Sequence, residues 1–350
     1  PWKSRVKFIS RFEVWLGNSE PDLSDTLEIA GIIVNRGERK FGALSVAETP
    51  VASIDLPITI VNGENPGKIL CVTAGVHGCE YVGIEAALRL SRKVSPKQLH
   101  GTLIIIPIIN VPAFNSRTMY VCPIDNININ RVFPGNKGRS ISHAIARSLF
   151  EKIITKANFL VDFHCGDLVE ALIPFTVFFR TGKTTVDRIS QDLGARFDVK
   201  YELEARAQTQ EYSPVGASFA EAARIGIPAI VSEAGELGLL DERYVNHQYK
   251  GVLNIMAHLG MLPNYNVRQF KPKILHKGAY LYADKSGFFY PNVRVGQTVS
   301  KGRLLGRICN IDGKVVQEIR AQSKCVVLCL GVNPSVQAGH VLFMTGNFKN

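Results

Sequence analysis

His77 and Glu80 lie three residues apart in the segment Gly75-Val-His-Gly-Cys-Glu, at the end of an apolar run from Ile69 to Val76. A turn between a strand and a helix can point an imidazole and a carboxylate the same way, which gives half of a zinc site. Open α/β folds hold their ligands at such turns, at the carboxyl ends of the strands. Alone, this pair is a weak signal, because His-x-x-Glu occurs by chance in many chains.

A second apolar run, Phe159 to Phe163, brings His164 to a glycine turn. A catalytic zinc ion usually takes three protein ligands and keeps a fourth position open for water. We therefore predict that His77, Glu80 and His164 bind one zinc ion per chain. Asp162 would share the face of His164 on a strand, where it either orients an imidazole or is an ordinary strand-end residue.

A metal hydrolase also needs a group that takes a proton from water. Glu233 follows a third apolar run, Ile227 to Val231. Burial there would raise its pKa towards the range of a general base. Glu236 is the rival carboxylate, but it lies in a loop, and a strand end holds a catalytic group more rigidly. We predict Glu233 as the base.

The polar segment 117–135 carries Arg117 and Arg131, with Asn130 beside the second arginine. An arginine fork can bind a carboxylate through two hydrogen bonds. An arginine near a metal can instead polarise a carbonyl group and stabilise an oxyanion. The alternative interpretation is a surface loop whose arginines are solvated.

Together these segments resemble the succinylglutamate desuccinylase/aspartoacylase family, relatives of the zinc carboxypeptidases, over roughly residues 68–346. The matching motifs are Gly75-Val-His-Gly-Cys-Glu, Asn130-Arg-Val-Phe-Pro-Gly, Val161-Asp-Phe-His and Pro228-Ala-Ile-Val-Ser-Glu-Ala-Gly, in the order of the family. The resemblance implies zinc at His77, Glu80 and His164, and Glu233 as the base.

The same resemblance implies that Asn130 and Arg131 grip the substrate carboxylate and that Arg117 polarises the carbonyl group. Two departures from the family pattern are Cys79, where many members carry Asp, and Cys165, where a small residue is usual. Neither departure removes a ligand, so both bear on substrate choice rather than on the chemistry.

The composition and net charge limit the kinds of molecule that the protein is expected to bind. The 350 residues carry a net charge of +11, from 41 Lys and Arg against 30 Asp and Glu. The basic residues are scattered and not interleaved with aromatic residues, which argues against nucleic acid as a partner and favours steering of a small anionic substrate.

No apolar run approaches 18 residues, so we expect no transmembrane helix. The seven cysteines lie mostly in apolar strands, which favours reduced thiols. The N-terminal residues lack the apolar core of a signal peptide, so we expect a cytoplasmic protein.

Strands alternate with helical patterns along residues 61–265, which predicts an α/β fold with a mixed sheet flanked by helices, like that of zinc carboxypeptidases. The predicted helices are Val82–Val94, Ser142–Ala157, Val186–Phe197, Ser218–Ile225 and Val245–Leu259.

Two further regions flank this catalytic domain. Residues 1–60 contain short β-like stretches (Arg11–Leu16, Leu27–Val34 and Leu56–Val61) and are expected to form an N-terminal elaboration packed on it. Residues 266–350 change to short strands and glycine turns, which predicts a C-terminal all-β domain resembling a biotinyl/lipoyl-type sandwich.

The sequence thus favours a zinc-dependent amidohydrolase, a deacylase that removes an acyl group from an N-acylated amino acid or similar small amide. One alternative is a zinc carboxypeptidase acting on peptides, although a C-terminal domain bordering the pocket would favour small substrates. The other is a non-catalytic small-molecule or partner-binding module that keeps the fold. Assembly of the chain into a homo-oligomer is compatible with either class.

Overall fold

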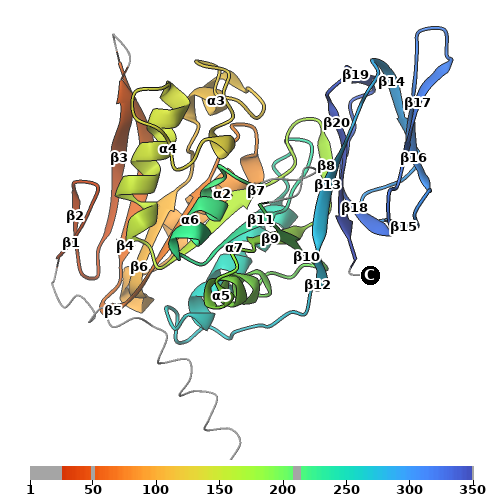
Figure 1. Ribbon diagram of the computed structural model, residues 1–350. Coiled ribbons are helices and arrows are strands. Elements are labelled where there is room, and N and C mark those ends of the chain that lie inside the picture. Colours follow the sequence, from red (N-terminus) through yellow and green to blue (C-terminus); the bar gives the residue numbers. More distant parts are fainter. Residues whose placement is uncertain (1–25, 49–51, 208–213, 349–350) are drawn as a thin grey trace, which may run out of the picture.

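A computed structural model describes residues 26–48, 52–207 and 214–348 of the chain (Figure 1). The predicted stretch Arg11–Leu16 lies outside these described residues. A nine-stranded mixed sheet forms the centre of the molecule. From one edge to the other, its strands are β12 (Lys273–Leu275), β10 (Tyr201–Ala205), β9 (Phe175–Phe179), β11 (Ala229–Glu233), β7 (Phe159–His164), β5 (Asn65–Ala74), β6 (His100–Ile106), β4 (Ser53–Asn62) and β3 (Arg39–Glu48).

The middle of this sheet is parallel. β7 pairs in parallel with β5 on one side and with β11 on the other. All six residues of β7 are buried, as expected for an apolar strand covered on both faces. The carboxyl ends of β5, β7 and β11 therefore meet at one edge of the sheet, the edge at which open α/β folds bind ligands.

Helices cover both faces of the sheet. Buried side chains of α2 and α7 join one core cluster, whereas those of α4 and α6 join the cluster on the other side. The helices are α2 (Tyr81–Lys93), α3 (Val111–Ser116), α4 (Ile141–Lys152), α5 (Thr184–Gly194), α6 (Ser218–Ile225) and α7 (Glu242–His258), with short 3-10 helices η1 (Pro96–Gln98), η2 (Ile129–Arg131) and η3 (Ile154–Lys156). Each predicted helix has a counterpart, while α3 was not predicted because it is short and lies beside the polar segment.

Two antiparallel sheets make up the C-terminal part, drawn in blue in Figure 1. The first contains β13 (Lys277–Tyr282), β20 (Val341–Asn347), β18 (Cys325–Gly331) and β15 (Thr298–Val299), and the second contains β17 (Val315–Arg320), β16 (Leu304–Cys309), β14 (Gly287–Pro291) and β19 (Ser335–Val336). Phe289 and Phe343 meet edge to face between the sheets, with ring centroids 5.5 Å apart. The mixed α/β sheet and the added β sheets confirm the predicted fold class.

The C-terminal sheets are joined to the central part by a strand from the middle of the chain. β8 (Glu170–Leu172) pairs with β18 and so belongs to the first C-terminal sheet. Conversely, β12 lies beyond the predicted boundary at residue 265 but pairs with β10 of the central sheet. The division into three domains stays a prediction, although hydrogen-bonded strands cross its boundaries.

The predicted stretch Leu27–Val34 is a hairpin rather than one strand. β1 (Thr26–Ile29) and β2 (Ile32–Asn35) pair antiparallel around Ala30 and Gly31, which both have positive φ. Two such residues in a row form a tight hairpin turn whose twist matches that of the flanking strands. Within the described part of the chain, none of the helices has the length and apolar character that a membrane span requires.

Candidate metal centre and active site

Three neighbouring strands carry the predicted metal ligands and base. His77 and Glu80 follow β5, His164 is the last residue of β7, and Glu233 is the last residue of β11. Glu233 and His164 are directly paired across the two parallel strands. The Gln248 side chain of α7 donates hydrogen bonds of 3.0 Å to the carbonyl oxygens of His164 and Ser232, which ties the two strand ends together.

The turn that carries His77 and Glu80 depends on glycine. Gly75 has a φ of +62°, a conformation that side chains disfavour. A Cβ at Gly78 would lie 2.3 Å from the backbone of Ala113 in α3, so only glycine allows this close approach. Helix α2 starts directly after Glu80, which fixes the direction of that side chain relative to His77.

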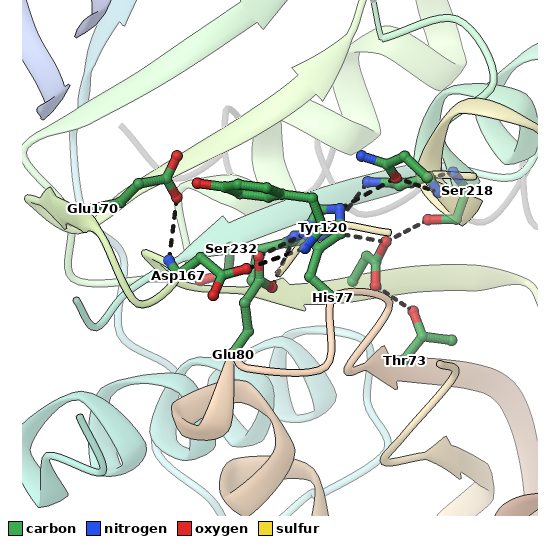
Figure 2. A network of polar contacts seen from close by, with 12 residues as sticks. Thr73, His77, Glu80, Tyr120, Asp167, Glu170, Ser218 and Ser232 are labelled. Carbon is green, nitrogen blue, oxygen red and sulfur yellow. Dashed lines mark hydrogen bonds and ion pairs between the residues drawn. The ribbon is translucent and has the colours of Figure 1, made fainter. Parts of the chain in front are cut away.

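The Nδ1 atoms of both histidines converge on the Glu80 carboxylate (Figure 2). His77 Nδ1 lies 2.7 Å from Glu80 Oε1, and His164 Nδ1 lies 3.0 Å from Glu80 Oε2. One ligand atom from each of the three residues lies within 4.8 Å of the other two, and all three residues are buried.

This cluster fits a divalent cation. Glu80 Oε2 is buried without a hydrogen-bond partner, because its contact with His164 lacks the alignment of a hydrogen bond. Burial alone would raise the pKa of Glu80, but the charges of His164 and His77 outweigh it and lower the pKa to about 2. An ionised, incompletely satisfied carboxylate beside two imidazoles is a donor set that suits zinc.

A network behind the cluster orients His164. Asp162 Oδ2 lies 3.4 Å from His164 Nε2, on the ring edge that faces away from Glu80. The Asp162 carboxylate is fully buried and accepts hydrogen bonds from the hydroxyl groups of Thr73, at 2.7 Å, and Ser218. These contacts favour the orienting role over the ordinary strand-end role that the sequence left open.

The second histidine has a comparable partner that the sequence did not indicate. Asn128 Oδ1 lies 3.3 Å from His77 Nε2 and also accepts a hydrogen bond of 2.8 Å from the backbone N–H of Asn130. The Asn130 side chain bonds to the N–H of Ser218 at 3.1 Å and approaches His164 Nε2 at 3.4 Å. Asn130 is therefore buried behind the histidines, apart from the cavity wall.

The carboxyl group of Glu233 is buried at the end of β11. Burial raises its pKa to about 8; the charge of His164 opposes this shift, and the carboxylates of Glu80 and Glu170 add to it. Glu233 lines the cavity beside His77 and His164, whereas Glu236 does not.

A cavity of about 490 Å³ opens over the cluster. Its inner end is formed by the strand ends, and its outer wall comes from the C-terminal sheets. The residues of that wall are Tyr280, Tyr282, Cys329, Gly331, Asn333, Val336, Gly339, His340, Val341, Leu342 and Met344. Segments more than a hundred residues from the ligands in sequence thus enclose the same space.

The two predicted arginines occupy different places. Arg131 lines the cavity, and its guanidinium group donates a hydrogen bond of 2.7 Å to the carbonyl oxygen of Asn130. Arg117 ends α3 with a φ of +56°, is exposed and lies outside the cavity lining. Met119 and Tyr120 of the same loop reach the cavity instead.

Several lining residues had no signal in the sequence. Tyr120 packs its ring edge to face with His77 at a centroid distance of 5.9 Å. Its backbone N–H donates to Asp167 at 3.3 Å, and its hydroxyl group points towards Glu170 in Figure 2. Only the position of Tyr120 in the polar segment could have suggested a role, because tyrosine carries no ligand pattern.

The two cysteines that depart from the family pattern are both buried. Cys165 lines the cavity, and burial raises the pKa of its thiol well above the usual range. Such a neutral thiol acts as a small apolar surface rather than as a nucleophile. Cys79 is fully buried and outside the cavity lining, and burial also raises the pKa of its thiol.

The fold and site define an α/β protein with a His-Glu-His cluster at the carboxyl ends of parallel strands. Residues 66–259 match the family model for the succinylglutamate desuccinylase/aspartoacylase catalytic domain. This match covers more than half of the chain, and the protein belongs to that family.

Individual relatives match almost the whole chain. The N-alpha-acetyl-L-2,4-diaminobutyric acid deacetylase of Halomonas elongata is 25% identical over an alignment of 339 residues, which covers 93% of this chain and 95% of the relative. The product-bound ectoine utilization protein EutE of Ruegeria pomeroyi superposes with a TM-score of 0.81 at 24% identity, covering 93% and 99% of the two chains. A succinylglutamate desuccinylase from Silicibacter sp. TM1040 has a TM-score of 0.78 at 24% identity, covering 89% and 95%.

Proposed function

We propose that the protein is a zinc-dependent amidohydrolase that removes a short acyl group from an N-acylated amino acid. The observation that carries this proposal is the convergence of His77, Glu80 and His164 beside Glu233 in one cavity. Membership of the desuccinylase/aspartoacylase family and the deacetylase from Halomonas elongata support the reaction class. The same relative supports an N-acetylated amino acid as the kind of substrate to test first.

In this proposal His77, Glu80 and His164 hold one zinc ion per chain, which would supply Lewis acidity for activating water and polarising the acyl carbonyl group. Glu233 takes a proton from the attacking water and passes it to the nitrogen of the leaving amine. The amide C–N bond breaks, and a carboxylate and an amine are released. Asp162 and Asn128 keep the histidine rings in place through the nitrogens that face away from Glu80.

Arg131 is proposed to bind the substrate carboxylate, because it is the arginine in the cavity lining. Asn130 was expected to share this carboxylate contact, but its side chain lies outside the cavity lining. We propose that it acts instead by fixing the backbone next to Arg131 and by its contact with His164. Arg117 is retained as the proposed oxyanion stabiliser, a role that requires its exposed side chain to turn into the cavity when substrate binds. The outer wall from the C-terminal sheets favours small substrates over peptides.

A cytoplasmic location also belongs to this proposal. All seven cysteines are free and buried, which supports a reducing compartment.

A substrate panel tests the proposal. The zinc-loaded protein is assayed with N-acetyl, N-succinyl and N-formyl amino acids, including N-acetyl-diaminobutyrate. We expect release of the free amine from at least one short-acyl substrate, and loss of release when a chelator removes the metal. Hydrolysis of peptides in preference to all N-acyl amino acids would support the carboxypeptidase alternative instead. Absence of any hydrolysis by the zinc-loaded protein would favour a binding module.

A further inference from the structure

Glu170 is a cavity carboxylate that the proposed chemistry does not use. It is the first residue of β8, the strand that pairs with β18 and joins the central part to the C-terminal sheets. Its partner in the register is Gly331, which has no side chain to cover it. Both residues line the cavity, so the Glu170 carboxylate faces the space where substrate would bind.

The position of this carboxylate is fixed by its neighbours. The backbone N–H of Asp167 donates to Glu170 Oε2 at 3.1 Å. The Tyr120 side chain also hydrogen-bonds to Glu170, and Figure 2 shows its hydroxyl group directed at the carboxylate. Tyr120 is itself held by its N–H bond to Asp167 and by its contact with the ring of His77. Glu170 is thus held in place in the wall.

No basic side chain within the described ranges forms an ion pair with Glu170. Much of the lining of the same cavity is apolar, including Leu172, Val336, Leu342 and Met344. A partly buried carboxylate against such a surface is costly unless a cation compensates it. Hydrogen bonds from the Asp167 N–H and from Tyr120 favour the ionised form of Glu170, but burial outweighs them and raises its pKa. A cationic group of a ligand in the cavity would supply the missing compensation.

We propose that Glu170 binds an ammonium group on the side chain of the substrate, so that the enzyme selects N-acylated diamino acids. Arg131 takes the α-carboxylate, Glu170 takes the side-chain ammonium group, and the apolar wall contacts the methylene groups between them. Acidic side chains, such as those of aspartate and glutamate derivatives, are repelled by the same carboxylate. This inference rests on the proposed deacylase function and assigns its substrate class.

A matched pair of substrates tests this selection. N-α-Acetyl-L-2,4-diaminobutyrate and N-acetyl-L-norvaline have side chains of equal length and differ in one ammonium group. For the parent enzyme we expect kcat/KM to be about tenfold to a hundredfold higher for the amine, as for a hydrogen bond to a charged group. In Glu170→Gln this ratio should fall by at least about tenfold. Glu236→Gln, which changes a carboxylate outside the cavity lining, should keep the parent ratio.

The second readout is binding without turnover. Calorimetry with L-2,4-diaminobutyrate and L-norvaline on the zinc-loaded protein should show tighter binding of the diamino acid in the parent and loss of that preference in Glu170→Gln. If Glu170→Gln does not fold, Tyr120→Phe replaces it, because this variant removes one hydrogen bond from Glu170. We expect Tyr120→Phe to lower both the kcat/KM ratio and the difference in binding affinity between the diamino acid and norvaline.

An equal kcat/KM for the two substrates in the parent, or an unchanged ratio in a folded Glu170→Gln protein, would overturn the role of Glu170. Failure of the deacylase function looks different: no N-acyl amino acid is hydrolysed, while the calorimetric preference for the diamino acid remains.

Discussion

Two buried glutamates, one at the end of the central sheet and one within it, have pKa values shifted in opposite directions. Glu80 is 3% exposed and Glu202, in β10, is 0% exposed. Two imidazoles lie within 3.0 Å of the Glu80 oxygens, and they lower its pKa to about 2 in spite of burial. Neither oxygen of Glu202 has a hydrogen-bond partner, and burial, with the charge of Asp192, raises its pKa well above the usual range.

Burial by itself therefore favours the neutral carboxyl group in this part of the molecule, and a neighbouring cationic group is needed to favour the ionised form. The end of the sheet at β5, β7 and β11 brings cationic groups to Glu80, whereas Glu202 in β10 has no such partner. Its strand neighbour Glu204 does, because ion pairs with Arg180 and Arg206 lower the pKa of Glu204. Substitutions at the end of the sheet should change activity, and those at Glu202 should change stability.

The largest effect is expected for Glu233→Gln. The variant keeps the shape of the side chain but cannot take a proton, so kcat should fall by roughly 10²–10⁴ while fold and metal content stay as in the parent. Steady-state kinetics, circular dichroism and metal analysis of the purified variant check this. The matched control is Glu236→Gln, and a larger loss in that control would assign the base to Glu236.

The next effect separates the two arginines. Arg131→Ala should raise KM for substrates with a free carboxylate by about tenfold to a hundredfold and matter less for the neutral amide analogue, because a carboxylate grip acts in ground state and transition state alike. Arg117→Ala should lower kcat by about 10²–10³ on both substrates if the side chain meets the oxyanion. Kinetics on a matched acid and amide pair measure both.

A different result would contradict the predicted role of each arginine. Equal effects of Arg131→Ala on the acid and the amide would exclude the carboxylate role. If Arg117→Ala has the same kinetics as the parent, Arg117 does not stabilise the oxyanion. It would then be a solvated residue of the loop, as its exposed position suggests.

A smaller effect is the pH dependence of kcat/KM. A base must be ionised, and the pKa of Glu233 is raised to about 8, so activity should increase with pH along an acid limb whose midpoint lies at or below that value. A divalent cation at the neighbouring ligands moves the midpoint lower by favouring the ionised form. Rates that fall between pH 6 and 8 would contradict Glu233 as a base of raised pKa.

The smallest effect concerns the other half of the sheet. Because burial raises the pKa of Glu202, the folded protein keeps a proton on this group to a higher pH than the unfolded chain does. The stability from this group is thus present at low pH and is lost as pH rises towards the raised pKa of the folded state. Urea unfolding of Glu202→Gln across pH 5–9 should show a smaller loss of stability with pH than the parent shows. Parallel pH curves for the two proteins would mean that Glu202 is ionised in both states.

The strand-end residues could be predicted from the sequence because each follows an apolar run and has a glycine one or two residues further on. His77, His164 and Glu233 all have this pattern, and parallel pairing of β5, β7 and β11 brings them together. The fold class was accessible for the same reason, since alternation of apolar runs and helical patterns extends over some two hundred residues.

The outer wall and its carboxylate could not be predicted. Tyr280 and Val336 belong to short strands whose approach to the cavity depends on the pairing of β8 with β18, a contact between segments about 160 residues apart. Glu170 has no neighbouring motif, because its hydrogen bonds come from a backbone N–H and from a tyrosine some fifty residues earlier. The exposed position of Arg117 likewise depends on where the short helix α3 ends.

The central claim is that His77, Glu80 and His164 form a zinc site. Its most direct test is the metal content of the purified protein, measured by mass spectrometry after exhaustive dialysis, in the parent and in a His77→Ala, His164→Ala double variant. We predict one zinc ion per chain in the parent and none in the double variant. Stoichiometric zinc that survives in the folded double variant would contradict the assignment.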